Sequence, residues 1–327
     1  REEILMSEVI EVNGTRSNGF NEHPSKRKAK VQFEGQTLSV AVGATVGEVL
    51  GQIYISSQAI VGATLNNHAV SLNTKVDGDS VLEAIKGDSR EGQSILRRTS
   101  THIFHAALSQ AVPQVRVMVG QSLLGGYYYE VQGWSGELSD LAAAVTAAMT
   151  EMIDKDLPLE RQQISVEALD RWVADPFGHK QRLLRAWAGP VVQIVTLEGF
   201  SEMMHGPCAA STGVARGARV ICYPPGLILM FPDAAATSPL PCAPPSDSAT
   251  PAGHKLFLSY RETRNWNRLI GVSALGDLNA AALEDRFDEV IRLAEALHEK
   301  KIAEIADAIT ERRETLKLVC IAGPSSS

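Results

Sequence analysis

Two short stretches of the chain carry side chains that could bind a metal ion or catalyse a hydrolysis. In the first, His102 and His105 are three residues apart in a run of apolar residues at helical spacing, so both imidazoles can face one side of a helix. In the second, His205 and Cys208 flank a Gly-Pro pair, which is typical of a turn. These four residues could form a tetrahedral zinc site, and a histidine beside bound water could act as a general base. The simpler alternative is a pair of surface histidines and a buried structural thiol.

The pattern around these residues predicts the elements that position them. The Ser/Thr-rich run Thr99–Thr101 favours a helix cap, and Pro113 closes the helical pattern. The segments RVMVG and GGYYYEV then predict a pair of strands. Successive tyrosines alternate between the faces of a strand, so at most two of the three can face a pocket, and packing is their expected role.

The rest of this middle region, residues 89–278, alternates helical and strand patterns. An amphipathic helix is expected at 139–155, a short helix at 166–174 and a further helix at 179–188. The runs VVQIVTLEGF, ARVICY and LILMF predict strands. Residues 233–253 are dominated by Ala, Pro, Ser and Thr and predict a disordered insertion.

The front of the chain predicts a polar, flexible arm over residues 1–28, followed by a small domain over residues 29–88. A hairpin around Glu34-Gly35, one short helix and further strands are expected to close a β-grasp sheet. At the other end, Asn279 is a candidate cap for a long helix over 279–315. Residues 316–327 then predict an apolar strand running into Gly323, Pro324, Ser325, Ser326 and Ser327, the first half of a P-loop.

Composition bounds the class of protein. The 327 residues, 44% of them hydrophobic, are enough for at least two domains, and the net charge of −7 argues against broad attraction to nucleic acid. Four cysteines without paired spacing suit a reducing compartment, so an intracellular, cytoplasmic protein is expected, with an organelle or a cytoskeletal assembly left open. No apolar run has membrane-spanning length. The chain begins with Arg rather than Met, so its true N-terminus stays open.

Several of these motifs together resemble threonyl-tRNA synthetase. Residues 30–86 are similar to its TGS domain, and the order R-x-S-x-H, RVMVG, GGYYYEV, DLPLERQQIS and E-x-x-x-GP-x-x-x-STG resembles its editing domain. That family hydrolyses mischarged tRNA with two histidines on a helix and a cysteine and a histidine around the Gly-Pro turn. The resemblance places those positions at Arg98, His102, Met204 and Cys208, with Glu202 as the nearby acid. Only His102 keeps the family's residue type, so the pocket, with His105 and His205 beside it, is expected to lack hydrolase activity and to bind no metal.

The whole order, ending in HEKKIAEIADAI and IAGPSSS, resembles uridine kinase-like proteins that carry a threonyl-tRNA synthetase-like front. This resemblance implies an α+β fold and a P-loop kinase domain that would use ATP and Mg²⁺, whereas no cofactor is expected for the present residues. It implies that this portion recognises an RNA or a protein. Two alternatives stay open, namely a non-catalytic subunit of a large assembly and an aminoacyl-tRNA editing hydrolase.

Overall fold

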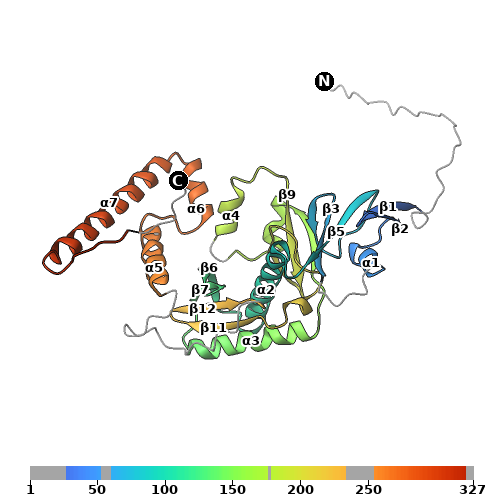
Figure 1. Ribbon diagram of the computed structural model, residues 1–327, viewed down its shortest axis with the longest axis horizontal. Helices are drawn as coiled ribbons and strands as arrows, with labels where there is room; N and C mark the ends of the chain where they lie inside the picture. The colour runs from blue at the N-terminus through green and yellow to red at the C-terminus, as the bar shows by residue number, and fades with distance from the viewer. Residues whose placement is uncertain (1–26, 53–59, 176–177, 233–253, 322–327) are drawn as a thin grey trace, which may run out of the picture.

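The computed structural model describes residues 27–52, 60–175, 178–232 and 254–321. Three predicted segments lie outside the described residues: the arm except for its last two residues, the insertion at 233–253, and the partial P-loop Gly323–Ser327. The described part is a mixed α+β structure with three sheets. Figure 1 shows a small sheet at one end, a central body and a group of three helices at the other end.

The small sheet has five strands in the order β2-β1-β5-β3-β4, and its central strands β1 and β5 run parallel. Alternate residues of β1 are buried, and with Val46, Val49 and Leu50 of the helix they form the local core. The predicted hairpin, helix and further strands are therefore present, while the TGS assignment stays a prediction. The elements are β1 (Lys28–Phe33), β2 (Gln36–Ala41), α1 (Val46–Gly51), β3 (Ile60–Leu65), β4 (His68–Val70) and β5 (Ser80–Lys86).

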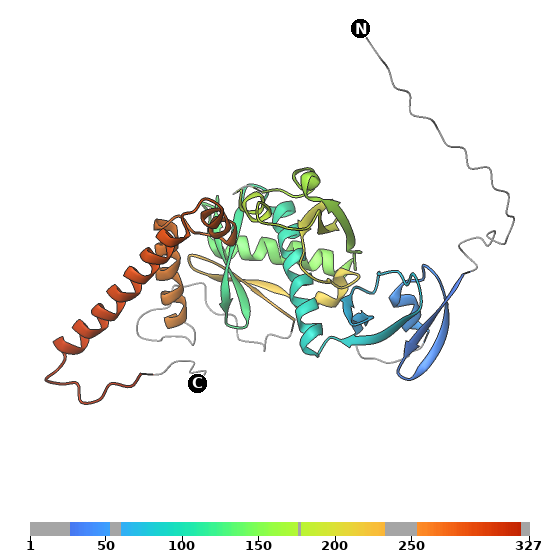
Figure 2. The ribbon, with the colours of Figure 1, turned by 90° about the horizontal axis from the view of Figure 1, so that it is seen from above.

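Helix α2 (Arg90–Ala111) connects the small sheet to the body. Val61 and Ile85 of the sheet form one buried cluster with Ile95 and Leu96 of the helix and with Ala209 of the body. Asn73 Nδ2 also donates a hydrogen bond to the Ala210 carbonyl over 3.1 Å. The small sheet is thus packed against the body rather than tethered to it (Figure 2).

The predicted start of this helix is wrong. Its N-cap is Ser89, whose hydroxyl accepts a hydrogen bond from Gly92 N over 3.0 Å, while Thr99 lies buried in the third turn. The Thr99 hydroxyl donates to the Ile95 carbonyl inside the helix, so it does not serve as a cap. The predicted end is correct, because the helix stops at Ala111, two residues before Pro113.

Two antiparallel sheets build the body. The four-stranded sheet β11-β12-β7-β6 is covered on one face by α2 and α3. Tyr129 faces this core and packs against Phe104, and Tyr128 points to the other face and packs against Phe257, as the predicted alternation requires. These elements are β6 (Arg116–Leu123), β7 (Gly126–Gln132), α3 (Leu138–Asp154), β11 (Arg219–Tyr223) and β12 (Gly226–Met230).

The three-stranded sheet β10-β9-β8 carries the Gly-Pro turn. The run VVQIVTLEGF forms a hairpin rather than a single strand, because Glu198 and Gly199 both take a positive φ and reverse the chain. The helices expected at 166–174 and 179–188 are both shorter in the structure. The elements are β8 (Glu160–Ser165), the 3₁₀ helix η2 (Val166–Arg171), α4 (His179–Leu184), β9 (Val191–Leu197), β10 (Phe200–Met203) and the 3₁₀ helix η3 (Thr212–Ala215).

Three helices follow: α5 (His254–Leu269), α6 (Leu275–Leu283) and α7 (Phe287–Glu311). The predicted long helix from Asn279 is wrong, since Asp285 takes a φ of +56° and separates α6 from α7. The predicted strand at the end is also wrong, because residues 316–321 take no regular structure. A strand needs a neighbour for its backbone hydrogen bonds, and no described strand pairs with this segment.

The cysteines differ in state. Cys208 is buried and free, and Cys320 is exposed and free. Cys222 takes part in a disulfide, so the expectation of unpaired cysteines is wrong for this residue. Within the described part of the chain, every helix is too short or too polar to cross a membrane.

Candidate binding site between α2 and the β9-β10 hairpin

The Gly-Pro turn is fixed to helix α2 by two side chains. Arg98 Nε donates to the Pro207 carbonyl over 2.9 Å, and the Thr99 hydroxyl accepts from Ala209 N over 2.9 Å. Gly206 has a φ of +95°, and a methyl group added there would lie 3.1 Å from Arg98 Cζ. Arg98 therefore occupies the predicted pocket position as a structural donor, and partial burial lowers the pKa of its guanidinium.

His102 is completely enclosed. Its side chain is 0% exposed, and neither ring nitrogen has a hydrogen-bond partner. The ring of Phe200 on β10 lies 5.6 Å from the imidazole, centroid to centroid. Burial lowers the pKa of His102 from 6.5 to about 4, so the imidazole is neutral at physiological pH.

His105 lies one turn further along α2 and lines a cavity of about 410 Å³. Its ring packs edge-on against Phe104 and Tyr129. Burial, followed by the charge of Lys180, lowers its pKa to about 4. The cavity has an apolar wall from α2 and β6 and a polar wall from α4 and β10, with lining residues that include Leu108, Val117, Val119, Lys180, Phe200 and Glu202.

Glu202 and Lys180 form an ion pair in the cavity wall. Lys180 Nζ lies 2.8 Å from a Glu202 carboxylate oxygen and 2.7 Å from the Ala174 carbonyl. The other Glu202 oxygen accepts from Met203 N over 2.8 Å. Both side chains are about one-fifth exposed, so this ion pair is available to a ligand that enters the cavity.

Met204 and Cys208 lie behind the turn and face away from this cavity. Both pack in an apolar cluster with Leu159 and Val195. Burial raises the pKa of the Cys208 thiol to about 11, so the thiol is protonated at neutral pH and is a weak nucleophile. His205 is exposed, with its ring 5.8 Å from that of Trp187.

The structure therefore divides the predicted pocket residues among four places. His105 and Glu202 line the cavity, Arg98, Met204 and Cys208 belong to the turn and its core, and His102 and His205 are respectively enclosed and at the surface. Among residues 27–52, 60–175, 178–232 and 254–321, no three His, Cys, Asp or Glu side chains are grouped as a metal site requires.

Sequence reasoning missed Lys180 and Phe200, which complete the cavity. Lys180 is the second residue of a six-residue helix, and its role depends on where that helix packs. Phe200 follows the Glu198-Gly199 reversal, so recognising the hairpin would have placed it opposite α2.

These geometries define a mixed α+β protein, and comparison with known proteins shows which proteins it resembles. No protein-family model matches the chain. It is 28% identical to a threonine–tRNA ligase of Desulfovibrio desulfuricans over 59% of this chain and 31% of the relative. The corresponding protein of Clostridium kluyveri is 25% identical over 57% and 30%, and that of Rubrobacter xylanophilus is 29% identical over 55% and 28%. The chain thus covers about three-tenths of the length of these relatives and is similar to a threonyl-tRNA synthetase-like region.

Proposed function

We propose that residues 29–278 form a recognition module that binds the 3′ end of an RNA in the cavity beside His105, without hydrolysing an ester bond there. The similarity to threonine–tRNA ligases supports RNA as the ligand. The observation that carries the absence of hydrolysis is the enclosure of His102, whose unpartnered ring nitrogens lie behind Phe200.

The chemistry of the other groups supports the same conclusion. A general base works best with a pKa near the operating pH and must lie within hydrogen-bond reach of the attacking water. His102 is out of reach of solvent, and His105, which lines the cavity, has its pKa lowered to about 4 and is a weak base. Arg98 and Met204 stand where the family resemblance places a histidine and a cysteine, and both are engaged in packing the turn.

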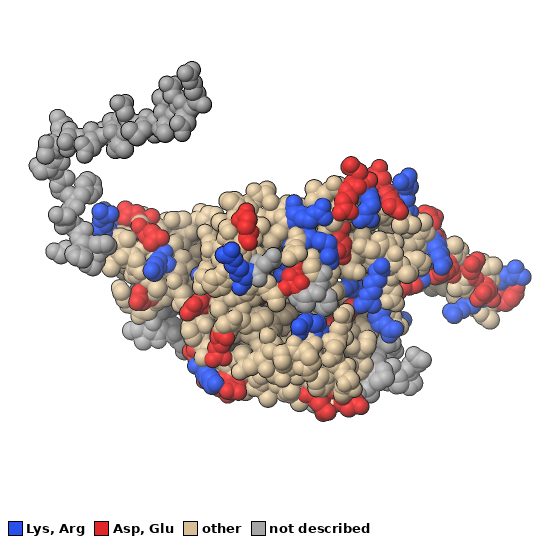
Figure 3. All heavy atoms as spheres, turned by 180° about the vertical axis from the view of Figure 1, so that it is seen from behind, with Lys and Arg blue, Asp and Glu red and all other residues tan. Residues whose placement is uncertain are grey.

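The surface charges favour a local contact over broad attraction to RNA. On the face drawn in Figure 3, basic and acidic side chains are interspersed over the body, in keeping with the net charge of −7. A protein with a net negative charge is not broadly attracted to an RNA backbone, and few basic contacts give little counterion release. Recognition would therefore depend on the cavity, where apolar residues accept a base or an aminoacyl group and Lys180 and Glu202 contact polar atoms.

Blocking the cavity mouth tests this proposal. Val119 lines the cavity and is 59% exposed, so Val119→Trp should fold and fill the opening. Binding of an aminoacylated tRNA minihelix, measured by fluorescence anisotropy, should weaken at least tenfold. Val81→Trp is the matched control, because Val81 is a 45% exposed strand valine that does not line the cavity.

The same minihelix distinguishes binding from editing. The ester should hydrolyse at the same rate with and without the protein. Deacylation that exceeds the buffer rate and is lost in His105→Ala would establish the editing alternative instead. Equal affinity of wild type and Val119→Trp would contradict the cavity as the RNA site.

We further propose that this chain is the front part of a P-loop nucleoside kinase. The support for this proposal is the sequence that follows α7. The described residues do not fit an ATP and Mg²⁺ site, because residues 316–321 form no strand to present a phosphate-binding loop. No phosphoryl-transfer step is therefore assigned to this chain. Gene sequence encoding Gly-Lys-Ser or Gly-Lys-Thr after Ser327 would support the kinase setting, and a degenerate loop would favour a non-catalytic subunit of an assembly.

A further inference from the structure

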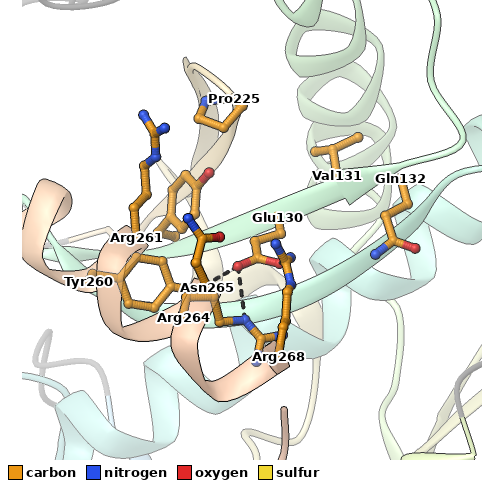
Figure 4. A pocket seen from close by; sticks show the side chains of 10 residues that line it. Glu130, Val131, Gln132, Pro225, Tyr260, Arg261, Arg264, Asn265 and Arg268 are labelled. Atoms are coloured by element: carbon orange, nitrogen blue, oxygen red, sulfur yellow. Dashed lines mark hydrogen bonds and ion pairs between the residues drawn. The ribbon is translucent and has the colours of Figure 1, made fainter. Parts of the chain in front are cut away.

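A second cavity, of about 260 Å³, lies between β7 and α5 on the opposite face of the four-stranded sheet from the main core. Figure 4 shows Arg261, Arg264, Asn265 and Arg268 entering it from one helix, with Glu130 on the neighbouring strand β7. The three arginines follow one another at intervals of three and four residues, so they lie on one face of α5. The cavity is thus lined by three guanidinium groups and a single carboxylate.

Glu130 neutralises only part of this charge. One of its oxygens lies 3.0 Å from Arg264 Nε and accepts from the Tyr260 hydroxyl over 3.0 Å, and its other oxygen pairs with Arg268. Arg264 is only 8% exposed and also donates to the Ser273 carbonyl. Arg264 therefore closes the floor of the cavity and holds α5 against the sheet.

Arg261 has no ion-pair partner within the described part of the chain. Its guanidinium lies 6.0 Å from the ring centroid of Phe257 and points away from Glu130 in Figure 4. Arg268 is 48% exposed along its side chain, so one edge of its guanidinium is open to a ligand. Asn265 and Gln132 add two exposed side-chain amides to the lining. The cavity therefore presents several donors and two positive charges more than it has negative ones.

We propose that this cavity binds a phosphate group, with Arg261 and Arg268 as its direct contacts and Asn265 and Gln132 as additional donors. Guanidinium groups bind phosphate through paired, charge-assisted hydrogen bonds, and their planes are pre-oriented here by Glu130 and Phe257. The cavity is slightly smaller than the usual range for ligand sites, which favours a compact anion or the phosphate end of a larger molecule over a whole nucleotide. This site does not depend on the proposed RNA cavity beside His105.

Calorimetric titration of the whole protein with inorganic phosphate, at constant ionic strength in sodium chloride, tests the proposal. Saturable binding is expected, and Arg261→Ala should weaken it at least tenfold with little change in the thermal unfolding midpoint, because Arg261 is exposed and its one described contact is the distant ring of Phe257. Arg261→Lys should retain part of the affinity, since it keeps the charge and loses the paired donors. Arg216→Ala is the control, because Arg216 is an exposed arginine that does not line this cavity.

The source of the phosphate is found with two short RNA oligonucleotides that differ only in a 5′-phosphate or a 5′-hydroxyl. If the phosphorylated oligonucleotide binds more tightly, and Arg261→Ala removes this difference, the cavity binds the end of an RNA. If both oligonucleotides bind equally while inorganic phosphate binds saturably, the cavity binds a free phosphate compound. The proposal is overturned if neither probe binds saturably. It is equally overturned if Arg261→Ala binds as wild type does, or if Arg216→Ala causes the same loss; the arginines would then serve only to fasten α5.

Discussion

The imidazole of His102 has apolar surroundings and no hydrogen-bond partner, although it could both donate and accept. Such a group destabilises a folded protein by roughly 1–3 kcal/mol relative to a satisfied one. The pattern of apolar residues correctly places His102 on a helix, but it does not show that Phe200 covers the ring. That contact depends on a hairpin some 100 residues away along the chain, and local sequence carries no signal for it.

The buried histidines predict acid sensitivity. The pKa values of His102 and His105 are lowered to about 4 in the folded protein from an ordinary value of 6.5. Below pH 6.5 the unfolded chain binds more protons than the folded one, so stability is complete above this pH and falls as the pH decreases toward 4. His102→Leu should therefore gain stability over wild type as the pH is lowered, by roughly 2 kcal/mol more at pH 5 than at pH 8. Urea denaturation at the two pH values measures this difference, and an equal gap at both would contradict the assigned burial.

At the scale of elements, Thr99 and Arg98 show how a helix holds a turn. The spacing R-x-S-x-H predicts the frame of the pocket, and the structure does bring α2 beside the Gly-Pro turn. The same spacing does not predict that the helix starts at Ser89, because the Ser/Thr run at 99–101 has the residue types of a helix cap and is taken for one. The start of α2 depends instead on where β5 ends, at Lys86, and the end of β5 depends on the order of the strands in the sheet.

Gly206 gives a test of this turn. Gly206→Ala should destabilise the protein both through its φ of +95° and through the 3.1 Å contact with Arg98, by roughly 1–3 kcal/mol in total. Gly217→Ala is the matched control, since Gly217 has a φ of +94° and its nearest atom lies 4.0 Å away. The difference between the two free energies of unfolding measures the contact alone. It should vanish when Arg98 is also changed to Ala, and its persistence there would show that Arg98 does not hold the turn.

At the scale of the whole molecule, the interior was easier to predict than the ends. The small sheet, the strand pairs and the α3 stripe all follow from apolar periodicity, because burial imposes that periodicity directly. Helix α7 has the same kind of stripe but no buried residue, so periodicity alone cannot say whether a partner covers it. For the same reason residues 316–321 look like a strand in sequence and form none.

Removing α7 should therefore cost little. A chain that ends at Arg286 loses this helix, which is about 37 Å long. None of the 25 residues of the helix is buried. Its contacts with α5 are the exposed Lys301–Glu262 pair and Lys300 over the Trp266 ring at 5.4 Å. We expect the thermal unfolding midpoint to fall by less than about 4 °C, because exposed pairs contribute little. A larger loss in scanning calorimetry would show that α7 belongs to the cooperative unit.

The packing of the small sheet on the body sets a fixed span within the molecule. Gly92 has no room for a side chain against the Lys86 carbonyl, and Ile95 fills the space above Gly62, so β5 and α2 meet at one angle. A long ligand that touched both the sheet and the cavity beside His105 would have to match that span, and shorter or longer ones would engage only one end. The molecule would then discriminate among ligands by their length, before any base or amino acid is distinguished.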